Sequence, residues 1–173
     1  MASHLVSMVS TATAKATEQP VTKGSSFADI ELGEGNANYV KTMDARLDPV
    51  SMCGLEVGDA HIIRNGGGRA ADAMRSLIGS QEALQTREII VIHHEDCGYS
   101  HASTPVIQKA LKSRTPDGAH PLVDAVALQE FSDPKQSVRE DVAFLRTNPL
   151  VHPDSMVSGW YYSVQTGELQ RVC

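Results

Sequence analysis

Histidine and cysteine side chains follow a short apolar segment near the middle of the chain. Ile89–Ile92 is apolar and β-branched throughout, and His94, Cys97 and Gly98 come soon after it. A run this short, apolar on both faces, is typical of a buried strand in a parallel sheet. Ligands and catalytic groups usually lie at the carboxyl ends of such strands. Because zinc is bound by imidazole nitrogens and thiolate sulfurs, His94 and Cys97 could hold one metal ion between them.

An acid and a guanidinium follow a second short segment. Tyr39–Thr42 is β-prone, and Asp44 and Arg46 lie in the polar turn after it. The carboxyl ends of parallel strands share one edge of a sheet, so we expect this turn to meet the turn that carries His94. His93 is expected on the opposite face from His94, because successive side chains of a strand alternate. The alternatives are a structural ion pair for Asp44 and Arg46, and inert packing for the histidine and the cysteine.

The elements that must position these residues alternate between strand and helix. The pattern predicts strands at 39–42, 61–65, 88–93, 156–164 and 169–172, and helices at 70–84, 101–113, 122–131 and from Pro134 onward, the last with Val138, Val142, Phe144 and Leu145 facing the core. Segment 114–120 reads as a loop. This order predicts an α/β fold, a mainly parallel sheet of four to five strands flanked by helices.

Length and composition indicate one globular domain. The chain has 173 residues, of which 41% are hydrophobic, enough for one core. We expect a flexible or helical arm over 1–26 and a single domain over 27–173, beginning with a loop at 27–38. The net charge of −6 argues against a nucleic-acid partner, and no apolar run is long enough to cross a membrane. Three irregularly spaced cysteines favour a reducing, cytoplasmic setting.

The two turns resemble the motifs of the β-class carbonic anhydrases, in particular their short bacterial and fungal branch. That family carries Cys-x-Asp-x-Arg and His-x-x-Cys, and this chain has Thr42-Met43-Asp44-Ala45-Arg46 and His94-Glu95-Asp96-Cys97. The resemblance covers roughly residues 38–172. Further matching segments are Gly58 to His61, Arg64-Asn65, Arg87 to His94, and Ser137 to Val142.

The resemblance implies a fold, a metal and a reaction. In the family, two cysteines and one histidine hold zinc, whose bound water has a pKa of ~7 and attacks carbon dioxide as hydroxide. By position, His94 and Cys97 would be metal ligands here, and Asp44 and Arg46 the catalytic pair that orients the water. The resemblance also implies a small-molecule substrate and a homodimer or tetramer.

Several residues depart from the family pattern around this pocket. Thr42 replaces the first cysteine ligand, and Lys41 replaces an apolar or small residue. Gly66 stands where the family has alanine, which would enlarge the pocket. Glu95 replaces a small residue and Tyr99 an apolar one. Glu95 could be a solvated acid or an extra carboxylate facing the pocket. Together these changes indicate altered chemistry.

Three hypotheses follow from this pattern. The first is a metal-dependent lyase or hydrolase acting on carbon dioxide or a related small carbonyl, in which Asp44 replaces the lost thiolate and joins His94 and Cys97 in holding about one zinc per chain. With His94 and Cys97 alone, zinc would be weakly bound or absent. The second is a metal-free enzyme acting on an organic substrate, with Cys97 as nucleophile and His94 or Asp44 as base, or with Asp44 and Glu95 in acid–base roles. The third is a non-catalytic relative. Because most of the constellation survives, an enzyme is the expectation.

Overall fold

A five-stranded sheet forms the centre of the molecule. The computed structural model describes residues 37–173. The strands are β1 (Ala37–Thr42), β2 (Ala60–Asn65), β3 (Glu88–His94), β4 (Met156–Tyr162) and β5 (Leu169–Arg171), in the order β2-β1-β3-β4-β5. All neighbouring pairs are parallel except β4 and β5. The predicted α/β fold is therefore confirmed, and the strand ends lie within two residues of the predicted ones.

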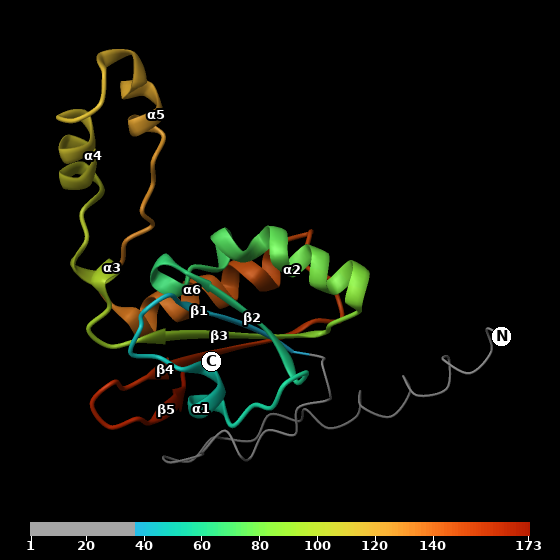
Figure 1. Ribbon diagram of the computed structural model, residues 1–173. Coiled ribbons are helices and arrows are strands. Elements are labelled where there is room, and N and C mark those ends of the chain that lie inside the picture. Colours follow the sequence, from blue (N-terminus) through green and yellow to red (C-terminus); the bar gives the residue numbers. More distant parts are fainter. Residues whose placement is uncertain (1–36) are drawn as a thin grey trace, which may run out of the picture.

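Helices cover both faces of the sheet (Figure 1). They are α1 (Pro49–Cys53), α2 (Ala70–Leu84), α3 (Gly98–His101), α4 (Thr104–Lys112), α5 (His120–Asp124) and α6 (Pro134–Thr147), with short 3-10 turns η2 (Gly66–Gly68) and η3 (Asp117–Ala119). Helices α2 and α6 pack on one face, and α1 lies against the other. The segment with α4 and α5 projects away from the sheet. Within residues 37–173, no helix is long and apolar enough to cross a membrane.

Alternating side chains of the central strands build two apolar layers. Ile89 and Val91 of β3 pack under α2 and α6, while Ile90 and Ile92 pack on the other face with Trp160. Each fully buried isoleucine contributes about 1.5–3 kcal/mol relative to an exposed one. Because the same alternation continues to the end of β3, His93 and His94 lie on opposite faces, as expected.

Helix α6 begins where the sequence predicts, at an Asp-Pro pair. The Asp133 carboxylate accepts hydrogen bonds from the backbone N–H groups of Lys135 and Gln136, which caps the helix. The apolar stripe contains Val138, Val142 and Leu145. The prediction for Phe144 is wrong, because its side chain is 38% exposed. Two positions after Val142, at 100° per residue, Phe144 points to the opposite side of the helix.

Two predicted helices differ from the observed ones. The helix predicted over 122–131 is wrong in extent, because α5 ends at Asp124 and Gln129 has a left-handed φ of 54°. The Gln108 amide donates to the carbonyls of Asp124 and Val126, so these acceptors are satisfied without further helical turns. The helix predicted over 101–113 divides into α3 and α4, with extended backbone at Ala102 and Ser103.

The amino-terminal expectations concern mainly residues outside the described part of the chain. The arm predicted over 1–26 and most of the loop predicted over 27–38 lie before Ala37. The end of that loop prediction is wrong, because Ala37 and Asn38 already belong to β1, where both are buried and paired with β2 and β3.

Candidate active site

The turns after β1 and β3 meet at one edge of the sheet. Asp44 Oδ2 lies 3.7 Å from His94 Nε2 across the two turns. Arg46 spans the same gap, because Nη2 donates to the Asp96 carbonyl at 3.0 Å and Nη1 to Asp96 Oδ2 at 3.1 Å. The buried Cys97 follows at once. All four residues named from the sequence thus lie in the two turns that meet here.

Arg46 donates hydrogen bonds to the Asp44 carboxylate from both its guanidinium group and its backbone N–H. Arg46 Nε donates to Oδ1 at 3.0 Å and Nη2 to Oδ2 at 2.7 Å, while the Arg46 backbone N–H donates to Oδ1 at 2.9 Å. These hydrogen bonds lower the pKa of Asp44 to about 2, so the carboxylate is ionised at neutral pH. The Arg46 side chain itself remains 44% exposed.

His94 is buried with both ring nitrogens lacking a hydrogen-bond partner among the described residues. The 3.7 Å separation from Asp44 is too long for a hydrogen bond. Burial lowers the pKa of His94, and the nearby Asp44 carboxylate opposes this only in part. The imidazole is therefore neutral at neutral pH. A neutral imidazole with unpartnered nitrogens can take a proton or bind a metal ion.

His93 lies on the opposite face of the sheet from His94, on the side of α2 and α6. Its Nε2 lies 3.1 Å from the Gly68 carbonyl oxygen and 3.3 Å from Asp141 Oδ2. Arg69 Nη2 contacts the other oxygen of Asp141 at 3.2 Å. This buried network fixes the turn η2 beside the site. Asp141 and Arg69 were not singled out from the sequence, although Asp141 lies within the matching Ser137–Val142 segment.

Two of the departures from the family pattern have structural partners of their own. Glu95 accepts hydrogen bonds from Ser163 Oγ and the Gln165 backbone N–H, both at 2.8 Å. It thereby anchors the connection between β4 and β5, rather than facing the site as a free acid. Lys41 points to the α1 face of the sheet, where its Nζ lies 2.9 Å from Met52 Sδ.

Gly66 does not enlarge the site, which corrects the expectation from the sequence. A Cβ at position 66 would overlap Tyr99 Oη and Cζ and lie 2.8 Å from Tyr99 Cε2. The tyrosine therefore occupies the space that a side chain at residue 66 would need. Gly66 and Tyr99, both singled out from the sequence, therefore depend on each other through this contact, which their positions in the sequence alone could not reveal.

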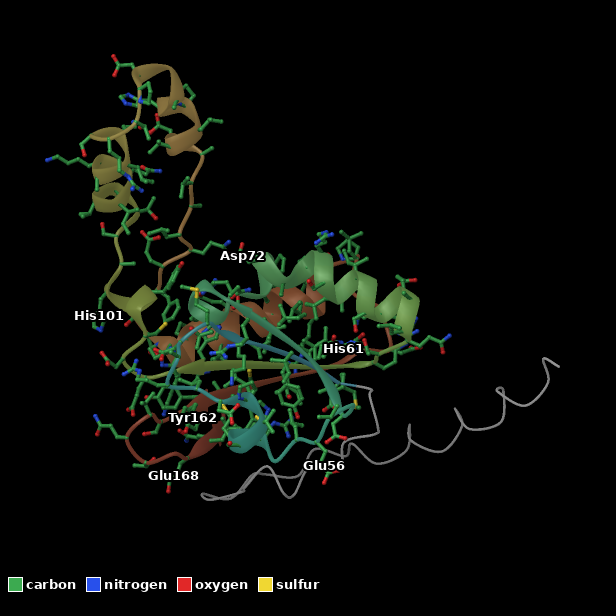
Figure 2. All side chains as sticks on the ribbon, in the orientation of Figure 1. Glu56, His61, Asp72, His101, Tyr162 and Glu168 are labelled. Carbon is green, nitrogen blue, oxygen red and sulfur yellow. The ribbon has the colours of Figure 1, made fainter. Side chains whose placement is uncertain are left out.

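His101 lies on the outer wall of the turn, on α3 at the foot of the projecting segment (Figure 2). Its Nε2 lies 3.4 Å from Asp96 Oδ1. Because Asp96 also binds Arg46, this contact supports the turn from outside. The side chain is 71% exposed.

The residues present do not fit a catalytic zinc site with three protein ligands. Buried, unpartnered His94 and buried Cys97 are suitable donors, but Thr42, which the resemblance puts at the position of the other cysteine, offers only a hydroxyl, which accepts from the Asp44 backbone N–H at 3.4 Å. Asp44 is held by Arg46. Within residues 37–173, no three His, Cys, Asp or Glu side chains are arranged to hold a metal ion. The geometry gives no support to Asp44 as a substitute for the missing thiolate.

Comparison with known proteins defines the family. The carbonic anhydrase family model matches residues 39–169. The β-carbonic anhydrase 1 of Mycobacterium tuberculosis is 37% identical over 134 residues, covering 77% of this chain and 79% of the relative. A carbon disulfide hydrolase of Acidithiobacillus thiooxidans is 32% identical, covering 74% and 72%.

Solved structures agree with this assignment. The carbonic anhydrase from Glaciozyma antarctica superposes with a TM-score of 0.78 at 45% identity, covering 85% of this chain and 88% of that one. The carbonic anhydrase from Streptococcus mutans gives a TM-score of 0.73 at 36% identity, covering 88% of each chain. The chain belongs to the β-carbonic anhydrase family and is a carbonic-anhydrase-like enzyme.

Proposed function

We propose that this enzyme adds water to a small linear or carbonyl substrate, with carbon dioxide as the first choice, and that its metal site is altered. The observation that carries the proposal is the ionised Asp44, held by Arg46 and facing a buried His94 whose nitrogens have no partner among residues 37–173. The related proteins are named as carbonic anhydrases and carbon disulfide hydrolases. Both names imply attack by water on the central carbon of a linear molecule.

The charge state of each residue decides its role in the proposed reaction. Arg46 fixes the Asp44 carboxylate, which accepts a hydrogen bond from the attacking water and orients it. With a pKa of about 2, Asp44 is too weak a base to remove the proton. While no metal is bound, neutral His94 can take that proton as the new carbon–oxygen bond forms, which gives bicarbonate. With zinc bound, as we expect for Thr42→Cys, His94 would hold the metal instead, and the zinc would supply the hydroxide. His94 and Cys97 offer only two donors to zinc, so we expect weak binding of the metal.

The test compares the natural protein with Thr42→Cys, and with Thr42→Ser as the matched control. Metal analysis is combined with stopped-flow carbon dioxide hydration and with sulfide release from carbon disulfide. We expect zinc well below one per chain in the natural protein and in Thr42→Ser. Thr42→Cys should bind zinc and gain hydration rate, because a third ligand is restored.

Two results would contradict the proposal. Nearly one zinc per chain in the natural protein would show that the metal site is not altered in effect. An absence of turnover of both substrates, in the natural protein and in Thr42→Cys, would reject the function itself.

A metal-free reaction is the second candidate, favoured by Thr42 at the position of a metal ligand. The Cys97 thiol would attack the carbonyl carbon of an organic substrate while His94 takes its proton. Turnover should then survive chelator treatment and depend on Cys97 and Asp44. If Cys97→Ala and Asp44→Ala both keep full turnover, this candidate is excluded.

We also propose that the chain assembles as a homodimer or tetramer, as the family resemblance implies. Large apolar side chains on the projecting segment support this proposal. Val106 on α4 and Leu122 on α5 are 66% and 75% exposed. Covering such side chains removes apolar surface from water, which favours association.

A further inference from the structure

Tyr99 and Gly66 interlock. The phenol occupies the space of a residue-66 side chain, as described above, and a Cβ at Gly67 would lie 3.3 Å from Tyr99 Cβ and Cγ. The ring therefore extends along Gly66 and Gly67, with its hydroxyl at the Gly66 end. A methyl group at position 66 could be accommodated only if the ring moved.

This contact places the phenol against η2, which lies beside the end of β1. The backbone next to Gly66 is fastened to β1, because the Asn65 carbonyl accepts from the Met43 N–H at 2.8 Å. A Cβ at Gly68 would lie 3.0 Å from the Thr42 nitrogen. Tyr99 itself follows Cys97 by two residues. The phenol thus extends from α3, just after Cys97, to η2, which lies beside Thr42. The family resemblance makes residues 42 and 97 the positions of the two cysteine ligands.

The hydroxyl of Tyr99 has no hydrogen-bond partner among residues 37–173. Within the described part of the chain, Tyr99 Oη makes no hydrogen bond, and the half-buried side chain keeps contact with solvent. Exchanging alanine 66 and an apolar residue 99 for glycine and tyrosine places a polar O–H group where the family pattern has a methyl group. The volume beside the backbone of residue 66 stays filled, but the group that fills it can now donate a hydrogen bond.

We propose that Tyr99 is a substrate-binding residue whose hydroxyl donates a hydrogen bond to an oxygen atom of the substrate. This inference rests on the proposed function and narrows its substrate class. It selects oxygen-bearing molecules, namely carbon dioxide, bicarbonate or a small carboxylate, over carbon disulfide. Oxygen accepts a hydrogen bond from a phenol much better than sulfur does. A site that donates a hydrogen bond discriminates against an analogue that cannot accept it.

The main experiment removes the hydroxyl and keeps the ring. Tyr99→Phe should lower kcat/KM for carbon dioxide about three- to tenfold, the loss expected for one hydrogen bond, and should lower kcat/KM for carbon disulfide by a smaller factor. Binding of ¹³C-bicarbonate, followed by NMR titration, should weaken by a similar factor. Tyr161→Phe is the control, because that phenol contacts Glu95 outside the site. Its bicarbonate binding should match the natural protein.

A second measurement tests the interlock without any activity. Gly66→Ala should lower Tm in the natural background and lower it far less in Tyr99→Met, because the smaller side chain leaves room for the methyl group. Equal losses of Tm in both backgrounds would contradict the interlock.

The outcomes separate this inference from the proposed function. Bicarbonate binding that depends on the Tyr99 hydroxyl, in a protein that turns over neither substrate, would reject the function and support the role of Tyr99. Bicarbonate binding by Tyr99→Phe equal to that of the natural protein would overturn the inference. So would equal losses of turnover with carbon dioxide and carbon disulfide, or a natural protein that binds no bicarbonate.

Discussion

Lys41 carries a buried ammonium group next to the candidate site. The side chain is fully buried, and its one hydrogen-bond partner among the described residues is the poor acceptor Met52 Sδ. Burial lowers its pKa from 10.5 to about 8. Below pH 8 the folded protein bears the full cost of the buried charge, about 3 kcal/mol. We expect Lys41→Met to unfold at higher urea concentration at pH 7, with a gain of about 2–3 kcal/mol in the free energy of unfolding.

The pH dependence of that gain provides the check. Between pH 8 and 10.5 the unfolded chain binds a proton that the folded state lacks, so the stability of the natural protein rises with pH. The advantage of Lys41→Met should therefore shrink across this window. Lys109→Met, at an exposed lysine of α4, is the control. It should change the free energy of unfolding by less than about 0.5 kcal/mol both at pH 7 and across this window. A destabilised Lys41→Met protein would refute the argument.

Asp44 is expected to act through its fixed charge rather than by accepting a proton. Asp44→Asn removes the ion pair with Arg46 and should lower kcat/KM for carbon dioxide by at least about 100-fold. The rate is measured in the natural protein and in Thr42→Cys. Because the pKa of Asp44 is about 2, any loss of rate between pH 8 and pH 5 must come from another group. The candidate is His94, whose pKa lies below its ordinary value. Full activity of Asp44→Asn would contradict this role.

The contact between α2, α6 and β3 depends on one buried carboxylate. Asp141 pairs with Arg69 at 3.2 Å and His93 at 3.3 Å, and accepts from the Ala70 N–H at 3.1 Å. Asp141→Ala would leave these groups buried without their partner. We expect a loss of about 3–5 kcal/mol in the free energy of unfolding, measured with urea. Glu140→Ala, at the exposed neighbour on α6, should lose less than about 0.5 kcal/mol, and equal losses would exclude a special role for Asp141.

The elements that could be predicted are those whose pattern comes from the core. Helix α2 and strand β3 have the predicted starts, because their apolar residues repeat with the period of the face that they bury. The segment 122–131 could not be predicted in the same way. Its helix ends where the Gln108 side chain, distant in sequence, satisfies two carbonyl groups. Such an ending depends on tertiary contacts that local periodicity does not contain.

The sequence predicts which segments meet at the candidate site, but not which side chains of those segments touch. The approach of Asp44 to His94 could be predicted, because parallel strands share an edge for their carboxyl ends. The roles of Glu95 and Tyr99 could not, because each depends on which backbone its side chain meets: the β4–β5 connection for Glu95 and Gly66 for Tyr99. Each of these residues departs from the family pattern, so the sequence marked the positions without giving their partners.

The projecting segment gives the molecule a surface suited to a second copy of the chain (Figure 1). Val106 and Leu122 expose most of their apolar surface there, at a cost that association would relieve. We expect size-exclusion chromatography with light scattering to give the mass of a dimer or tetramer, and Val106→Asp with Leu122→Asp to reduce it. Val57→Asp, at an apolar side chain before β2 that is even more exposed, should leave the mass unchanged. A natural protein that is monomeric at micromolar concentration would contradict assembly. Charges buried in an interface oppose association, so an unchanged mass in the double variant would place the interface elsewhere.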